Sequence, residues 1–97
     1  MYIKIHRSYR NVVAVCDAEL IGKILEEGEK QLDCRENFYK DKLVTKEEAV
    51  KIMRAQAADD ATFNIVGKKA TAAAVEAGLI EEKSIAIVAK TPLVLIF

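Results

Sequence analysis

Apolar and polar residues alternate over residues 1–6 at the start of the chain. A period of two that is rich in β-branched residues predicts a strand with one buried face. Residues 12–16 form an unbroken apolar run, which is typical of a strand covered on both sides. Ser8 and Asn11 favour a turn between the two segments. The opening of the chain therefore predicts a β-hairpin.

The clearest helical signal begins at Thr45, which Glu48 follows three residues later. This spacing predicts a capping box, in which each of the two side chains accepts a hydrogen bond from the other residue's amide. Apolar residues then recur at helical spacing, so we expect a helix that runs to about Ala57 or Ala58.

A second helix is predicted over residues 66–77, where Val66 and several alanines share one face. Gly78 is placed to end it, because glycine readily adopts the left-handed conformation that follows many helices. The pattern leaves the start of this helix open between Asp60, Asn64 and Gly67.

The remaining segments give weaker signals. Asp17 is a good N-cap and predicts a short helix that ends near Lys23. A turn is expected over residues 26–29 and a third strand over residues 31–34. Two further strands are expected near the end of the chain, over residues 84–89 and 93–97.

Strands thus gather at both ends of the chain and helices in the middle. This segregation predicts an α+β fold, a two-layer sandwich in which helices pack on one face of a mostly antiparallel sheet. We expect residues 1–97 to form a single domain, because a chain of this length builds one hydrophobic core. The strand at residues 93–97 is wholly apolar, so it belongs inside the sheet or at an edge covered by a second subunit. An edge covered by a second subunit would make the protein a homo-oligomer through this C-terminal strand.

Composition narrows the class of protein. Of the 97 residues, 52% are apolar and 31% are charged, which fits a packed globule and excludes a disordered chain. Basic and acidic residues cancel, so no overall charge draws the chain toward nucleic acid or a membrane surface. No apolar run approaches the roughly 20 residues that span a bilayer, so we expect no membrane association.

Cysteine and histidine usage gives no sign of a metal or a cofactor. Cys16 and Cys34 stand alone and His6 is the only histidine, so a zinc site cannot be completed. We expect two free thiols and a reducing, cytoplasmic setting. His6 and Cys16 lie on the two arms of the hairpin, but the apolar run around Cys16 predicts a buried, inert thiol.

Several blocks along the chain resemble a known family. They are Lys4-Ile5-His6, residues 13–17 and 20–23, Phe38-Tyr39, residues 64–67 and residues 77–80. Their order and spacing resemble the small archaeal proteins catalogued as domain of unknown function 424. The resemblance implies an α+β fold and an archaeal, cytoplasmic source, but no activity and no catalytic residues. The chain departs from the family in its apolar end, which argues against a ligand site there.

The best functional lead is a basic stretch at the start of the chain that contains no acidic residue. Its side chains on the outward face of the first strand and in the following turn are Tyr2, Lys4, His6, Arg7 and Arg10. Basic groups interleaved with aromatic rings on an exposed strand can meet the phosphates and bases of RNA. The alternative is an ordinary polar sheet face.

The sequence therefore favours a non-enzymatic binding or accessory module, associated with RNA, a ribonucleoprotein or a protein partner of the translation machinery. The competing interpretation is a small-molecule-binding protein, or an enzyme whose site forms between subunits. Two lysines after Gly67 offer a further, weaker candidate for an anion site at a helix start. The alternative is that Gly67 allows close packing while the two lysines are simply solvated.

Overall fold

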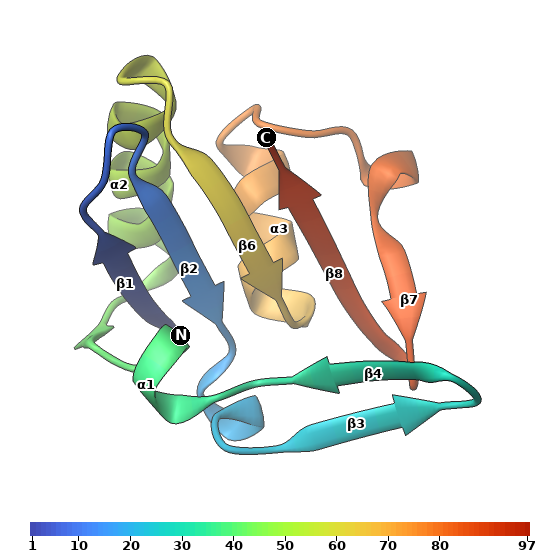
Figure 1. The fold of residues 1–97 in the computed structure, drawn as a ribbon. Coiled ribbons are helices and arrows are strands. Elements are labelled where there is room, and N and C mark those ends of the chain that lie inside the picture. The colour runs from blue at the N-terminus through green and yellow to red at the C-terminus, as the bar shows by residue number, and fades with distance from the viewer.

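A six-stranded sheet forms the centre of the protein, whose computed structural model describes all residues 1–97. Its strands lie in the order β5–β1–β2–β6–β8–β7 (Figure 1). Only β2 and β6 pair in parallel, and every other neighbouring pair is antiparallel. The bounds are β1 Tyr2–His6, β2 Val12–Cys16, β5 Lys42–Leu43, β6 Thr62–Val66, β7 Ala86–Val88 and β8 Thr91–Ile96.

Two helices, α2 (Lys46–Ala58) and α3 (Lys68–Glu76), cover one face of the sheet, and both lie behind it in Figure 1. Successive residues of a strand point to opposite faces, so every second residue of the inner strands meets these helices. The fully buried side chains on this side include Val13, Val15, Met53, Phe63 and Ile65. The α+β fold is thereby confirmed, with the two long helices on one face of a mostly antiparallel sheet.

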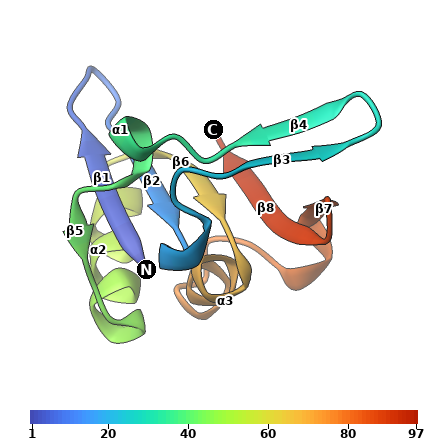
Figure 2. The same cartoon turned by 90° about the horizontal axis from the view of Figure 1, so that it is seen from below.

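The other face of the sheet carries smaller elements. Helix α1 (Glu36–Tyr39) lies against β1 and β2, and the hairpin of β3 (Ile24–Glu27) and β4 (Lys30–Asp33) reaches β7. Figure 2 shows this hairpin and the two long helices on opposite sides of the sheet. A second buried cluster forms beneath these elements from Ala14, Cys16, Cys34, Tyr39 and Val66.

The capping box predicted at the start of α2 is present. The Thr45 hydroxyl accepts from the Glu48 amide at 3.2 Å, and the Glu48 carboxylate accepts from the Thr45 amide at 3.0 Å. Both amides would otherwise lack a partner, since the first turn of a helix has no preceding carbonyls. These bonds from Thr45 also hold the pKa of Glu48 below its usual value, because they favour the charged carboxylate.

The structure corrects the start of the second long helix. Residues Thr62–Val66 form strand β6, so the placement of Val66 on a helix face is wrong. Its threonine, phenylalanine, isoleucine and valine favour a strand, and pairing with β2 and β8 on both sides satisfies that preference. Of the three alternatives for the helix start, Gly67 is the N-cap.

The short helix predicted from Asp17 to Lys23 is also wrong in extent. Only a single 3₁₀ turn, η1 (Ala18–Leu20), forms there. The Asp17 side chain makes no capping hydrogen bond to this turn. Gly22 then takes a positive φ of 83°, which turns the chain into β3.

The C-terminal strand is internal, as its apolar sequence predicts. β8 lies between β6 and β7, which leaves β7 at the edge of the sheet. β8 begins earlier than predicted because Ala89 and Lys90 form the hairpin turn with positive φ values of 50° and 62°. β7 is shorter than the predicted residues 84–89, because Glu82–Ser84 forms a second 3₁₀ turn, η2.

Candidate functional site

The outward face of β1 meets α1, and we call the surface that they form together the β1–α1 surface. Tyr2, Lys4 and His6 all point to this side, as alternation predicts. The Lys4 ammonium donates to the Asn37 carbonyl at 2.7 Å, and Nε2 of His6 lies 2.8 Å from the Phe38 carbonyl. Both side chains therefore hold α1 on the sheet, and both remain partly exposed to solvent.

An aromatic stack forms the centre of the β1–α1 surface. The rings of His6 and Phe38 are 4.6 Å apart between centroids and are inclined by only 20°. Tyr39 meets the edge of the stack at 4.9 Å from Phe38 and is itself buried. Beside the stack lies a hollow of about 400 Å³, which is lined by His6, Arg35, Asn37 and Phe38. A hollow of this size lies within the range of sites that bind small molecules or single bases.

The β1–α1 surface is weakly electropositive. Arg35 pairs with Asp33 at 3.1 Å, but its side chain is 70% exposed, so the pair is screened by water. Lys40 lies 3.7 Å from Glu36 and 5.6 Å from the centre of the Tyr2 ring. Lys4 has no carboxylate partner. One lysine charge is thus left uncompensated next to the aromatic stack.

The two arginines of the predicted site lie elsewhere. Arg10 donates to the Asp60 carbonyl at 2.9 Å and pairs with the Asp60 carboxylate at 3.3 Å. Arg7 lines a hollow on the helix-covered side, together with Ile5 of β1 and Gln56 of α2. The structure therefore brings Tyr2, Lys4 and His6 together and separates them from Arg7 and Arg10.

Three residues of the β1–α1 surface were absent from the predicted site. Arg35, Asn37 and Phe38 are remote from β1 in sequence and reach it only through the fold. The one local signal was the pair of aromatic residues Phe38 and Tyr39 in an otherwise polar connection.

The sheet face that carries the β1–α1 surface continues across the inner strands. Lys4, Ala14, Asn64 and Leu95 are register partners in four neighbouring strands. Asn64 is partly exposed. At the far side Leu95 is 49% and Phe97 is 86% exposed. Ala14 is fully buried, so Asn64 and Leu95 form a partly apolar shelf that is separated from the stack of His6 on Phe38.

The two thiols are structural. Cys16 and Cys34 are fully buried and free, and burial raises the pKa of each above its usual value. Burial likewise raises the pKa of Tyr39, to about 12. His6 pairs with Val12 in the register of the hairpin, whereas Cys16 pairs with Tyr2 at the other end. No nucleophile and base are brought together here.

The N-terminus of α3 is occupied by a side chain of the protein itself. The Asp17 carboxylate is 2% exposed and accepts from the amides of Lys69 at 3.1 Å and Ala70 at 2.8 Å. An incoming anion would have to compete with this carboxylate, which argues against the weaker anion-site candidate after Gly67. No three His, Cys, Asp or Glu side chains gather so that they could hold a metal ion.

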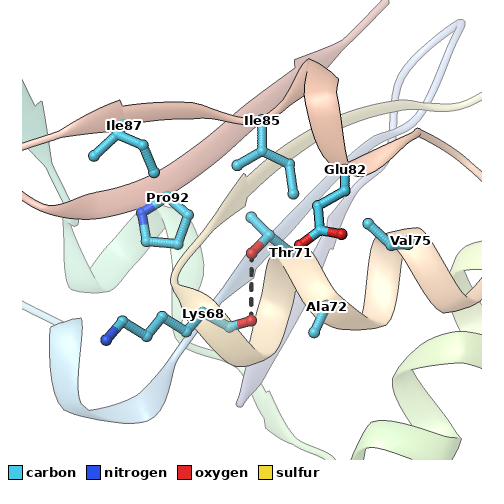
Figure 3. A pocket seen from close by; sticks show the side chains of 8 residues that line it. All are labelled: Lys68, Thr71, Ala72, Val75, Glu82, Ile85, Ile87 and Pro92. Atoms are coloured by element: carbon cyan, nitrogen blue, oxygen red, sulfur yellow. Dashed lines mark hydrogen bonds between the residues drawn. The ribbon is translucent and has the colours of Figure 1, made fainter.

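A second hollow, of about 480 Å³, lies between α3 and the β7–β8 hairpin (Figure 3). Its lining is mostly aliphatic, with Val75, Ile85, Ile87 and Pro92 among the residues that line it. Lys68 stands at the end near Ile87, and Glu82 stands at the end near Ile85. Thr71 is buried against the helix, where its hydroxyl donates to the Gly67 carbonyl at 2.8 Å.

Comparisons with known proteins agree with the fold and add no activity. A family described as "Protein of unknown function (DUF424)" matches residues 6–97. The crystal structure of an uncharacterized conserved protein from Methanopyrus kandleri is similar, with a TM-score of 0.90 and 28% sequence identity. The similarity covers 98% of this chain and 88% of that one. No curated protein matches the chain. None of the helices is long and apolar enough to cross a membrane.

Proposed function

Since the chain belongs to the DUF424 family, whose description records no activity, we propose from its geometry that the protein is a non-enzymatic module that binds single-stranded RNA on the β1–α1 surface. A base stacks in the hollow beside His6 and Phe38, and the neighbouring phosphates contact Lys4 and Arg35. The setting of this proposal is the cytoplasm, in association with the translation or RNA-processing machinery. Two reduced, buried thiols are compatible with that setting.

The observation that carries the proposal is the aromatic stack with its adjoining hollow and exposed cation. His6 and Phe38 present flat rings 4.6 Å apart beside a space of about 400 Å³. Arg35 lines the same space and its side chain is 70% exposed, so its guanidinium can contact the phosphate of a base that is bound there. Aromatic rings beside basic groups on a sheet face are a common way to recognise unpaired bases.

The shelf beyond the stack supports the same ligand. Asn64 presents a partly exposed amide that can donate to or accept from a base edge. Leu95 and Phe97 offer apolar area for a second base. A double helix does not fit this description, because its bases are stacked on one another and cannot reach the shelf.

The charge distribution sets the expected strength. The protein has no net charge, and Arg7 and Arg10 do not join the β1–α1 surface. Lys4 and Arg35 neutralise about two phosphates, so log affinity should fall against log salt with a slope of about −1.4 for a single strand. Binding should be weak and should be strongest at low ionic strength.

The proposal is tested by fluorescence anisotropy with short labelled single-stranded RNAs, measured over a salt series. Phe38→Leu keeps apolar bulk against the buried cluster and removes the ring, so affinity should fall by roughly tenfold, the size of one lost stacking contact. Arg35→Glu should lower affinity and reduce the salt slope by about 0.7.

Arg7→Glu is the matched control, because Arg7 lies on the helix-covered side and should leave binding unchanged. Circular dichroism of each variant shows whether the fold is kept. Failure of the unaltered protein to bind any single strand at low salt would refute the proposal. Equal loss in the Arg7 and Arg35 variants would show that the contact is not on the β1–α1 surface.

A further inference from the structure

The strand at one edge of the sheet, β7, has an unpaired side. It pairs only with β8, and no backbone hydrogen bond joins Ala86–Val88 to any other element. Ile87 in its middle is 55% exposed, which is unusual for an isoleucine next to the core. The β3–β4 hairpin contacts β7 but forms no backbone hydrogen bond with it, so this edge with its exposed aliphatic side chain is a surface to which a further strand can add.

Charges at the hollow beneath this edge are arranged with opposite signs at the two ends. Lys68 stands at the end toward which β7 runs, and Glu82 stands where β7 begins (Figure 3). Neither side chain forms an ion pair within the protein. Between them lie the aliphatic side chains of Val75, Ile85 and Pro92.

Such an arrangement is complementary to itself. If a second β7 adds in the antiparallel direction, a two-fold axis normal to the sheet relates the copies, and Lys68 faces Glu82 of the partner subunit twice. A parallel addition would instead place like charges together. In the antiparallel pairing, Ile87 of each copy lies over the aliphatic lining of the other.

We infer that the protein forms a homodimer through antiparallel pairing of β7 with β7 of a second copy, with the two Lys68–Glu82 pairs fixing the register. The paired strands have only three residues each, so few backbone hydrogen bonds can form. The interface therefore falls at the low end of specific interfaces, and the dimer is weak and depends on concentration. This surface is separate from the β1–α1 surface, so the inference does not depend on RNA binding.

Sedimentation velocity over a concentration series tests the dimer. The unaltered protein should show a monomer–dimer equilibrium. Lys68→Glu alone places four acidic groups at the interface, and Glu82→Lys alone places four basic groups there. Each should weaken the dimerisation constant by roughly tenfold, because two attractive exposed pairs become repulsive.

Mixing gives the decisive result. When the two single variants are combined, both acidic side chains of the Lys68→Glu chain face lysines of the Glu82→Lys chain, so a heterodimer should form at about the original strength. The double variant, Lys68→Glu with Glu82→Lys, should also recover self-association. Adding Ile87→Lys should abolish association in both cases.

Lys69→Glu and Glu81→Lys are the matched controls, since both residues are exposed neighbours that do not line the hollow. They should leave the equilibrium unchanged. A protein that stays monomeric throughout the concentration series would overturn the inference. Dimers that persist unchanged in all the charge variants would place the interface elsewhere and overturn it equally.

Discussion

Replacing Gly67 with alanine would test the junction between β6 and α3. Gly67 has φ 110° and ψ 159°, a conformation that is essentially restricted to glycine. Forcing another residue into such a region costs about 1–3 kcal/mol. A Cβ atom added there would also lie 2.6 Å from both carboxylate oxygens of Asp17. Real Cβ atoms do not approach other atoms so closely, so Asp17 would have to move.

Asp17 cannot move without losing its own contacts. Its carboxylate is 2% exposed and accepts from the amides of Lys69 and Ala70 at the start of α3. A hydrogen bond to a charged group contributes about 1.5–3 kcal/mol, and displacement weakens two of them without removing both. Backbone strain and the displaced carboxylate together predict a loss of about 3–5 kcal/mol. That is a large share of the roughly 5–15 kcal/mol that stabilises a typical domain.

The assay is urea denaturation followed by circular dichroism, applied to Gly67→Ala, Asp17→Ala and the double variant. Removing the carboxylate also removes the steric conflict, so the double variant should cost less than the sum of the single ones by about 1–3 kcal/mol. Gly78→Ala is the matched control. Gly78 also has a positive φ, of 80°, but no atom lies within 4 Å of an added Cβ. Its loss should be limited to about 1–2 kcal/mol of backbone strain.

The reasoning is wrong if Gly67→Ala destabilises the protein no more than Gly78→Ala does. It is also wrong if the effects of Gly67→Ala and Asp17→Ala simply add. Additivity would mean that the carboxylate and the glycine act independently, in spite of their contact.

Three further outcomes are expected. Thr45→Ala should lower the free energy of unfolding by about 1 kcal/mol in urea denaturation, and an unmoved midpoint would contradict the cap. The pKa of Glu48 is lowered on folding, so the contribution of Glu48 to stability should be present at neutral pH and should fade as the pH falls through that lowered pKa. Cys16 and Cys34 should react slowly with a thiol reagent in the native protein and rapidly in denaturant, because burial raises both pKa values; rapid native labelling would contradict their burial. Deleting residues 94–97 should give insoluble or unfolded protein, because β8 is internal, and a soluble truncation that unfolds cooperatively would show that the segment is dispensable.

Local signals predicted the elements that are stabilised locally. The capping box of α2 involves two residues three positions apart, so its hydrogen bonds can be inferred from sequence alone. The alternation of β1 and the apolar run of β2 identified a hairpin for the same reason. Strand β6 was missed because its pairing with β2 spans the middle of the chain, and its sequence merges into the alanine-rich helix that follows.

The candidate site was predictable only in part because its contacts are long-range. The outward direction of Tyr2, Lys4 and His6 follows from alternation, but their partners in α1 lie more than thirty positions away, at 33 for Lys4 and 32 for His6. Arg10 was assigned to the same surface, yet Asp60, 50 positions later, holds it elsewhere. No feature of a single sequence identifies such partners.

Asp17 shows how the fold reassigns a local signal and why that matters for both proposed surfaces. Its sequence position is that of a cap for the residues that follow it, but its carboxylate caps α3, more than fifty positions later, at 52 and 53. Asp17 directly follows Cys16 of the buried cluster beneath α1, and its hydrogen bonds fix the first turn of α3 on the other face. Lys68 lies in that first turn, so the same carboxylate that anchors the helix also sets where the cation of the β7 hollow stands. One buried side chain at the end of β2 thus links the β1–α1 layer to the groove at the opposite edge of the sheet.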